Sequence, residues 1–443
     1  MKPLDRLGHF AETLTWSKIP ASGQQRAHLA FRDTVGTIIG GSRTRAGQIA
    51  SHSVERRGPD AAGGPLKAFV TAVRASALDF DDGHYLGGAI HPGSVVVSSL
   101  LVAAQELDTT VRGLLTAQVV GYEIALRAAH LLWPRHEFDD YHCTGTAATL
   151  GAAAAVATLR GSDADTIARA IAIAWAHAPM STFQLPMVKE SIGWSACTAL
   201  FAADLADHGF MAMPAATRHS AIADTFPPTP FDRPGAMDDP FVSSLGTVFE
   251  SANTYFKPYA ACRYIHTAAR SLTELLKEES LTAHDIASID VFTHRGAANL
   301  TDVVPASLDH GQYSFPFVLA TVACTGSAGP DQISEGSLAL PDRLAFGARV
   351  RVHYDAELDA HYPAHYASRL VVTPRSGSRL ERIRLVAPGD PGDPMSDAEL
   401  ADKFASLSRP AFGDASEIVA AQLLDVDLPN DTLRVHMGST LST

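Results

Sequence analysis

Residues 79–91, which read DFDDGHYLGGAIH, contain three carboxylates and two imidazoles in a glycine-containing segment. These groups are Asp79, Asp81, Asp82, His84 and His91. Carboxylates and imidazoles this close together serve proton transfer or metal binding. Aspartates also cap helices and turns, so a structural interpretation stays open at this point. A second helix is predicted soon after His91, and its first amide groups would be available to an anion.

A further histidine, His142, stands directly before an Ala-rich helical pattern in DDYHCTGTAATLGAA. Thr144 and Thr146 are placed to cap that helix or to donate a hydrogen bond to a carboxylate. A lone histidine at a helix entrance is more often structural than catalytic. Its interpretation therefore depends on which other groups lie near it in the fold.

The cations that could bind an acid stand in two segments, MVKESIGW and YFKPYAACRYIHTAAR. They supply Lys189 in the first segment, and Lys257, Cys262, Arg263 and His266 in the second. Lys257 and Arg263, beside an aromatic-rich loop, are predicted to clamp a carboxylate, since arginine suits bidentate binding. The Cys262 thiol is a candidate acid or base, with a small buried filler as the alternative.

Charge and composition limit the class of partner. The formal net charge of −13 argues against a nucleic-acid surface or an anionic membrane, because both attract clustered lysine and arginine. The four cysteines form no CxxC pair, which favours a reducing cytoplasm. The sequence shows no secretion signal and no apolar run long enough to cross a bilayer. We therefore expect a cytoplasmic protein whose partner is a small carboxylic acid.

Several cofactor-dependent classes lack their motifs in this sequence. It contains no Gly-rich nucleotide loop, no GxSxG nucleophile elbow and no HExxH zinc helix. Nicotinamide, ATP and serine-hydrolase interpretations are therefore not supported. Acid and base chemistry by the protein's own side chains is the prediction that remains.

The elements that must position these groups are mainly helices. From about residue 24 to residue 209, apolar residues recur at three- and four-residue spacing. Helices are expected at residues 25–41, 66–78, 95–107, 111–132 and 165–178. With 443 residues and 46% hydrophobic composition, the chain is long enough for two domains or for one large domain with an insertion.

The pattern changes in the C-terminal half. Alternating or β-branched segments predict strands at residues 286–294 and 349–355, and two more within 367–388 around a Ser376-Gly377 turn. SDAELADKFASL carries a capping-box pattern and predicts a helix that returns to the body. We expect a mostly α protein in which residues 1–264 and 395–443 form an all-α body. Residues 265–394 would form an inserted α+β lid domain.

Six segments in order resemble the successive motifs of the MmgE/PrpD family, which includes 2-methylcitrate dehydratase, cis-aconitate decarboxylase and iminodisuccinate epimerase. The segments are LDFDD, IHPGS, HCTGTAATLGAAAA, FKPYAACRYIH, YSFPFVLATVACTG and PGDPGDPMSDAELADKF. The resemblance covers most of the chain. It implies an all-α body with an α+β lid, a site between them, a homodimer, and catalysis without a metal or an organic cofactor.

The resemblance also implies roles for individual residues. Asp79, His91 and His142 match family residues of the active site, Lys257 and His266 match the ends of the KPY segment, and Lys189 matches a substrate-binding lysine. We expect His91 and His142 to exchange protons, with Asp79 orienting a histidine or raising its basicity. Lys189, Lys257 and Arg263 would hold carboxylates. Thr144 would contact the substrate, and Asp81 and Asp82 would play supporting roles. His84 has no counterpart in the family pattern, and we expect it to be a local substrate contact.

Two departures from the family pattern bear on the reaction. Gly83 stands where the cis-aconitate decarboxylases have threonine, and Cys262 stands where they have histidine. A 2-methylcitrate dehydratase-like hydro-lyase is therefore the leading prediction. An epimerase or isomerase, a decarboxylase of a related polycarboxylate, and a catalytically inactive carboxylate-binding relative are the alternatives. A metal-dependent enzyme built on the Asp cluster is a rival that lacks a second metal-binding motif.

Overall fold

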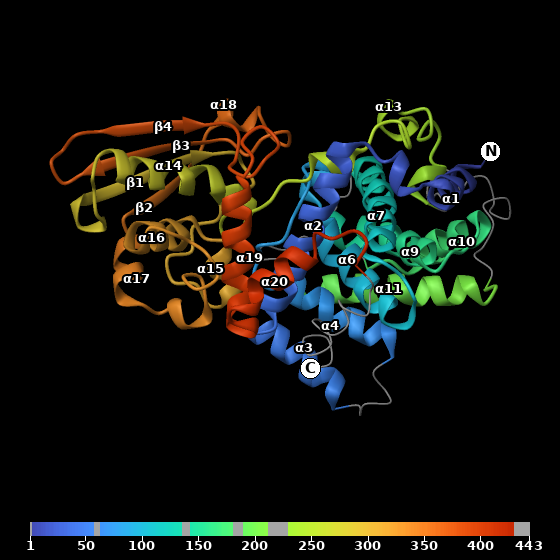
Figure 1. The fold of residues 1–443 in the computed structure, drawn as a ribbon. Helices are drawn as coiled ribbons and strands as arrows, with labels where there is room; N and C mark the ends of the chain where they lie inside the picture. The colour runs from blue at the N-terminus through green and yellow to red at the C-terminus, as the bar shows by residue number, and fades with distance from the viewer. Residues whose placement is uncertain (1, 57–62, 135–141, 180–188, 211–228, 429–443) are drawn as a thin grey trace.

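The computed structural model describes residues 2–56, 63–134, 142–179, 189–210 and 229–428. A helical body is joined to a smaller part that contains a four-stranded sheet (Figure 1). The mostly α fold with a small α+β part, predicted from the sequence, is thereby confirmed. Within the described ranges, no helix combines the length and the apolar character that a bilayer span requires.

The body contains every helix that the apolar periodicity predicted. Its main helices are α1 (Pro3–Thr13), α2 (Ala21–Gly41), α3 (Arg45–Glu55), α4 (Gly64–Ser76), α6 (Pro92–Ala103), α7 (Val111–Leu132), α9 (Cys143–Leu159), α10 (Ala164–His177) and α11 (Lys189–Asp207). Asp163 caps α10 and Thr110 caps α7, each through its side chain. The local sequence therefore sets where these helices begin.

Helix α9 lies at the centre of the body, where α6, α7, α10 and α11 pack around it. Residues 143–157 of α9 are all buried, as expected for a helix that is apolar on every side. A Cβ atom added to Gly151 would lie 2.2 Å from the Gly121 carbonyl oxygen, so α7 and α9 approach closely. This packing fixes the N-terminus of α9, where His142 stands.

An ion pair is buried within α7. Arg127 Nη1 donates to Glu123 Oε2 at 2.5 Å, and both side chains are fully buried. Arg127→Met is expected to lower the free energy of unfolding by about 3–5 kcal/mol, because it leaves the Glu123 charge buried without its partner. Urea unfolding measures this change. Arg112→Met removes an exposed pair with Asp427 and is the control, expected to cost less than about 1 kcal/mol. An equal cost for both variants would contradict the prediction.

The sheet has the order β2-β1-β3-β4. Strand β1 (Ile286–Thr293) pairs in parallel with β2 (Val350–Tyr354) and antiparallel with β3 (Ser368–Pro374), which pairs antiparallel with β4 (Leu380–Arg384). All four strands fall where the alternation predicted them, and Gly377 takes a positive φ of 88° in the predicted turn. Helices α14 (His266–Glu278) and α16 (Phe315–Thr325) pack against this sheet.

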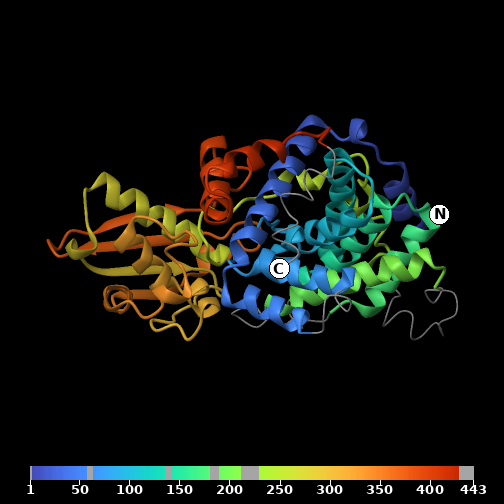
Figure 2. The same cartoon turned by 60° about the horizontal axis from the view of Figure 1, so that its bottom comes forward.

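The C-terminal helices return to the body. Helix α19 (Asp397–Phe412) begins with the predicted capping box, in which Ser396 and Glu399 bond reciprocally. Both views place α19 and α20 (Ala415–Gln422), drawn in red, beside the blue helix α2 (Figures 1 and 2). This packing supports a division into a body of residues 1–264 with 395–443 and a lid of residues 265–394, which we propose.

Candidate active site

Five of the predicted site residues come from four segments of the chain that meet in the body. His91 and His142 are the N-cap residues of α6 and α9, and Lys189 is the first residue of α11. Asp79 follows the end of α4, and Lys257 precedes α14 in the chain. All five side chains are buried. Three helix N-termini therefore converge on one cluster of acid and base groups.

Asp79 is held by two lysines. Lys257 Nζ lies 3.2 Å and Lys189 Nζ 3.4 Å from the same Asp79 Oδ1 atom, and Lys257 Nζ also donates to the Asp79 carbonyl at 3.2 Å. Burial disfavours the Asp79 charge, but the two ammonium groups outweigh burial and lower the pKa of Asp79. Asp79 has a positive φ of 48°, which aspartate tolerates better than most residues do. Asp79 is therefore an ionised carboxylate in this cluster.

The orientation of His91 assigns its tautomer. His91 Nδ1 lies 2.7 Å from the Asp82 carbonyl oxygen, which only accepts hydrogen bonds, so Nδ1 carries the hydrogen. The His91 backbone N–H donates to Thr144 Oγ1 at 2.9 Å. The lone pair of the neutral ring is therefore on Nε2. Burial and Lys257 lower the pKa of His91, against the opposing effect of Asp81 and Asp79, which favours this neutral, basic form.

His142 has the opposite tautomer. Its Nδ1 accepts the Thr144 backbone N–H at 3.2 Å and so caps α9, which puts the ring hydrogen on Nε2. The rings of His91 and His142 are nearly parallel, with centroids 6.4 Å apart. Burial, together with His91 and Lys189, lowers the pKa of His142 to about 3. The pair thus combines one basic nitrogen with one N–H donor.

The other two aspartates of the cluster face protein partners. Ser94 Oγ donates to Asp81, which also lies 3.7 Å from Lys257 Nζ. The Tyr122 hydroxyl lies 2.7 Å from Asp82 Oδ2. Asp79 and Asp81 thus share the Lys257 ammonium group, and Asp82 is engaged by Tyr122, so each of the three carboxylates already has a protein partner. Within the described ranges, no group of three His, Cys, Asp or Glu residues is placed to hold a metal ion.

A lysine from α19 secures the turn that carries Asp79. Lys403 Nζ donates to the Phe80 carbonyl at 2.7 Å and lies 2.6 Å from Asp33 Oδ1 on α2. Its ammonium group also lies 4.1 Å from the centroid of the Phe80 ring. The sequence analysis did not single out Lys403, although it belongs to the DKF of the last family-like segment. By holding the Phe80 carbonyl, Lys403 fixes the backbone between Asp79 and Asp81.

Arg263 and His266 are engaged inside the protein. Arg263 forms a buried ion pair with Asp390 and donates to the Pro388 carbonyl at 2.7 Å. His266 accepts from Arg263 through Nδ1 at 3.0 Å, and its Nε2 lies 3.0 Å from the Ala261 carbonyl oxygen. Both ring nitrogens of His266 are therefore used. These contacts disfavour the predicted role of Arg263 and His266 as direct substrate ligands.

Three further predicted residues also have local roles. His84 Nδ1 accepts the Leu86 N–H at 3.2 Å, and burial lowers the pKa of His84 to about 4. Burial raises the pKa of the Cys262 thiol to about 12, which keeps it protonated at neutral pH. Thr144 accepts from the His91 backbone, so it positions His91 in this structure. Asp79 was predicted to orient a histidine or raise its basicity; its side chain contacts the two lysines, and its charge acts to raise the pKa of His91.

The structure adds Tyr313 to the cluster. Lys189 Nζ lies 5.7 Å from the centroid of the Tyr313 ring, and the ring is buried. Burial raises the pKa of Tyr313 well above its ordinary value, so the hydroxyl remains a donor. The signal for Tyr313 was its place at the start of YSFPFVLATVACTG, a segment that the sequence analysis used only for the resemblance.

The lowered pKa of His91 predicts the pH dependence of proton abstraction. The neutral ring is the form of His91 that can accept a proton, and its folded-state pKa lies below the ordinary 6.5. As pH falls, kcat/KM is therefore expected to reach half of its plateau value at a pH below 6.5. Asp79 stays ionised throughout, because its pKa is lowered too. A rate profile measured from about pH 5 to 8 tests this, and an acid limb at or above 6.5 would contradict it.

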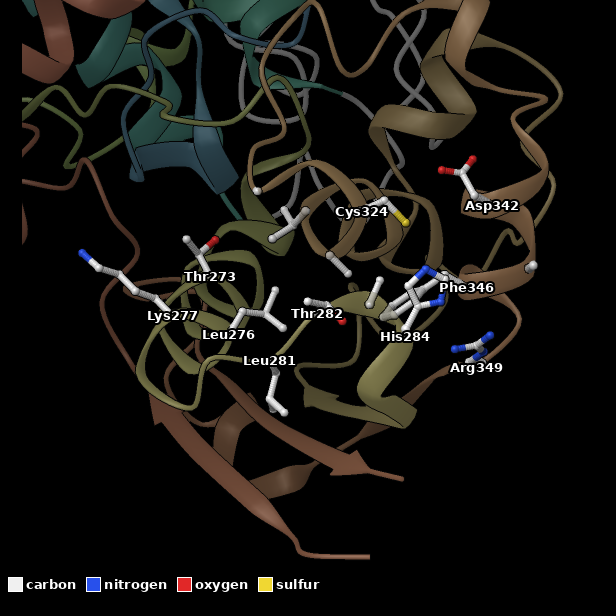
Figure 3. A pocket seen from close by; sticks show the side chains of 15 residues that line it. Thr273, Leu276, Lys277, Leu281, Thr282, His284, Cys324, Asp342, Phe346 and Arg349 are labelled. Carbon is white, nitrogen blue, oxygen red and sulfur yellow. The ribbon is translucent and has the colours of Figure 1, made fainter. Parts of the chain in front are cut away.

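A separate pocket of about 710 Å³ lies in the α+β part, between α14, α16 and α17 (Pro341–Gly347) (Figure 3). Its lining includes Leu276, His284, Phe346 and Arg349. Arg349 Nη1 already donates to the Ile286 carbonyl at 3.0 Å. None of the predicted site residues lines this pocket, so the acid and base cluster and the pocket are distinct features.

Comparison with known families agrees with the segments noted in the sequence. A family model described as the MmgE/PrpD N-terminal domain matches residues 5–221, and one described as the MmgE/PrpD C-terminal domain matches residues 259–425. The two models cover most of the chain, which confirms the resemblance. No curated protein matches the chain.

Proposed function

The chain belongs to the MmgE/PrpD family, and on this premise we propose that it is a lyase acting on a small di- or tricarboxylate. Family membership supports a dehydratase- or lyase-like enzyme in broad terms. Within that class we propose a hydro-lyase similar to 2-methylcitrate dehydratase, working through the protein's own acid and base groups. The basic Nε2 of His91, beside two lysines that share Asp79, is the observation that carries this proposal.

The proposed reaction begins with proton removal. His91 Nε2 takes a proton from the carbon beside a substrate carboxylate. The electron pair of the broken C–H bond first delocalises into the substrate carboxylate, and in a second step it forms the double bond as the hydroxyl on the neighbouring carbon departs. The proton on His91 then passes to that hydroxyl oxygen, which leaves as water, so no other reactant is consumed.

In the proposed reaction, the negative charge that develops on the substrate is stabilised by Lys189, Lys257 and His142. Negative charge develops on the substrate carboxylate while the C–H bond breaks, and preorganised donors near it lower the barrier. Burial opposes the charge of Lys189, but Asp79 raises the pKa of this lysine, which keeps its ammonium group positive. The neutral His142 ring supplies an N–H donor. This division of roles makes His91 the base and His142 the polarising group.

An epimerase is the second candidate, and Cys262 is the observation that favours it. An epimerase needs a proton donor on the face opposite the base, and a thiol whose pKa is raised to about 12 stays protonated. The charges of Asp79, Lys257 and Lys189 all influence this thiol. The two candidates differ in product, since an epimerase inverts the carbon without releasing water.

Proton NMR in deuterated buffer tests the proposed function. The probes are 2-methylcitrate, citrate, cis-aconitate and iminodisuccinate. We expect deuterium uptake beside a carboxylate and loss of water from a hydroxy acid, at a rate that chelator treatment does not change. Inversion without water loss would favour the epimerase, and loss of activity with chelator would favour a metal enzyme. Saturable binding without exchange or product would indicate a carboxylate-binding relative and overturn the proposal.

A homodimer and a cytoplasmic location complete the proposal. Both rest on the sequence analysis, the dimer through the resemblance and the location through cysteine usage and composition. Sedimentation of the purified protein measures the oligomeric state directly.

A further inference from the structure

The Tyr255 hydroxyl is a buried polar group that the proposed roles above do not use. Tyr255 has no exposed surface, and its hydroxyl has no hydrogen-bond partner among the described residues. A buried hydroxyl without a partner costs about 1–3 kcal/mol, and phenylalanine would fill the same volume without that cost. Packing alone therefore does not explain a tyrosine at this position.

Tyr255 lies beside the acid and base cluster. Its ring meets the His91 ring edge to face, with centroids 6.4 Å apart. The backbones of Tyr255 and Gly83 pair as an isolated bridge, with N–H to oxygen contacts of 2.8 Å and 3.1 Å. The bridge ties Tyr255 to the segment that carries Asp79, Asp81 and His91.

Gly83 provides the space that the Tyr255 hydroxyl occupies. A Cβ atom added to Gly83 would lie 2.4 Å from both Cζ and the hydroxyl oxygen of Tyr255. Any side chain at residue 83 would therefore displace the phenol. Gly83 has no positive φ, so its lack of a side chain is explained by this close approach and not by backbone conformation.

Arg263 and Asp390 hold the Tyr255 ring. The Arg263 guanidinium carbon lies 4.4 Å from the ring centroid, and Asp390 fixes the guanidinium through their buried ion pair. Tyr85 packs on the same ring at 5.1 Å between centroids and bonds to Asp390 at 2.6 Å through its hydroxyl. Burial raises the pKa of Tyr255 well above its ordinary value, so the hydroxyl keeps its hydrogen. The Arg263 charge over the ring makes the O–H a stronger donor.

We propose that the Tyr255 hydroxyl, admitted by Gly83 and held by Arg263, donates a hydrogen bond to the departing hydroxyl of a β-hydroxy carboxylate. This inference rests on the proposed hydro-lyase function and deepens it. It gives Arg263 a positioning role in place of carboxylate binding. It also makes Gly83 and Tyr255 a pair that selects substrates with a leaving hydroxyl.

Tyr255→Phe tests the inference with 2-methylcitrate and citrate as probes. Water loss is expected to fall about 100-fold in kcat, because one preorganised donor is removed. Deuterium uptake at the carbon beside the carboxylate should persist, since His91 is untouched. The thermal midpoint should not fall, because no hydrogen bond within the protein is lost. Water loss at the wild-type rate would overturn the inference.

Tyr366→Phe is the matched control. Tyr366 is also fully buried with an unpartnered hydroxyl. Its ring stacks with Tyr362 and His294 and meets Tyr264 and Tyr85 edge to face. This variant should keep both water loss and deuterium uptake. If Tyr366→Phe lowered water release as much as Tyr255→Phe, removal of any buried tyrosine hydroxyl near the site would have the same effect. That result would overturn the inference.

Gly83→Ser tests the pairing without touching the tyrosine. Its side chain displaces the phenol, so we expect a loss of water release similar to that in Tyr255→Phe. The variant that combines Gly83→Ser with Tyr255→Phe should lose no more water release than either single variant, because both substitutions remove the same hydrogen bond. Additive losses would contradict the pairing. Wild-type protein that releases no water would overturn the proposed hydro-lyase function, whereas wild-type water release that Tyr255→Phe leaves unchanged would overturn this inference alone.

Discussion

Replacing His91 by asparagine is expected to lower kcat for both deuterium uptake and water loss by about 10²–10⁴-fold, the range for removal of a positioned acid or base. The reason is that Nε2 of His91 carries the lone pair that the Asp82 carbonyl assigns to it through Nδ1. Asparagine is a good N-cap residue, so α6 should still begin at Pro92. Circular dichroism and thermal unfolding measure whether the fold is kept.

The control for this experiment is His130→Asn. His130 is only partly buried on α7 and pairs with Asp239 at 3.2 Å, away from the cluster. The His130→Asn variant should keep wild-type turnover. If His91→Asn turned over 2-methylcitrate at the wild-type rate, His91 would not be the base, and His142 would be the next residue to replace.

Replacing Lys257 by methionine is the second large expected effect. Lys257 Nζ contacts Asp79 at two oxygens and lies near Asp81, so its removal leaves a buried carboxylate with only Lys189. Breaking a buried charge pair costs about 3–5 kcal/mol in the free energy of unfolding. Loss of one preorganised donor for the developing charge is expected to lower kcat by about 10²–10³-fold. We expect KM to rise as well, because a cation for the substrate carboxylate is lost.

The Lys257 experiment needs a variant that separates folding from function. Lys257→Met combined with Asp79→Asn removes two of the buried charges and leaves Lys189 near Asp81 and Asp309, so the thermal midpoint should recover in part from the value of the single variant. Asparagine also tolerates the positive φ of residue 79. The catalytic activity of this double variant should stay low. Lys277→Met, at an exposed lysine on α14, should leave turnover unchanged. Recovery of activity in the double variant would assign Lys257 a structural role only.

Local structure was largely determined by the sequence. Apolar spacing predicted the body helices, alternation predicted all four strands, and Ser396 with Glu399 predicted the start of α19. These patterns depend on residues within a few positions of one another, so a single sequence carries them. The family-like segments likewise indicated which residues would meet in the site.

Only the tertiary structure decided what each site residue does. Arg263 and Lys257 look equivalent in YFKPYAACRYIH, but Asp390 neutralises Arg263, while Lys257 faces Asp79. The tautomers of His91 and His142 depend on the Asp82 carbonyl and the Thr144 N–H. Such assignments depend on the partner that burial brings within hydrogen-bond distance, and spacing along the chain does not contain that information.

In the segment of residues 79–91, the sequence determined some features and tertiary contacts determined others. The sequence supplied its carboxylates and imidazoles, and the end of α4 and the start of α6 fixed its place in the chain. Tertiary contacts then divided its groups, with Lys189 and Lys257 on Asp79 and Lys403 on the Phe80 carbonyl. A buried charge must find its counter-charge wherever the fold supplies one. Long-range packing therefore turned a local cluster of acids and bases into an ordered candidate site.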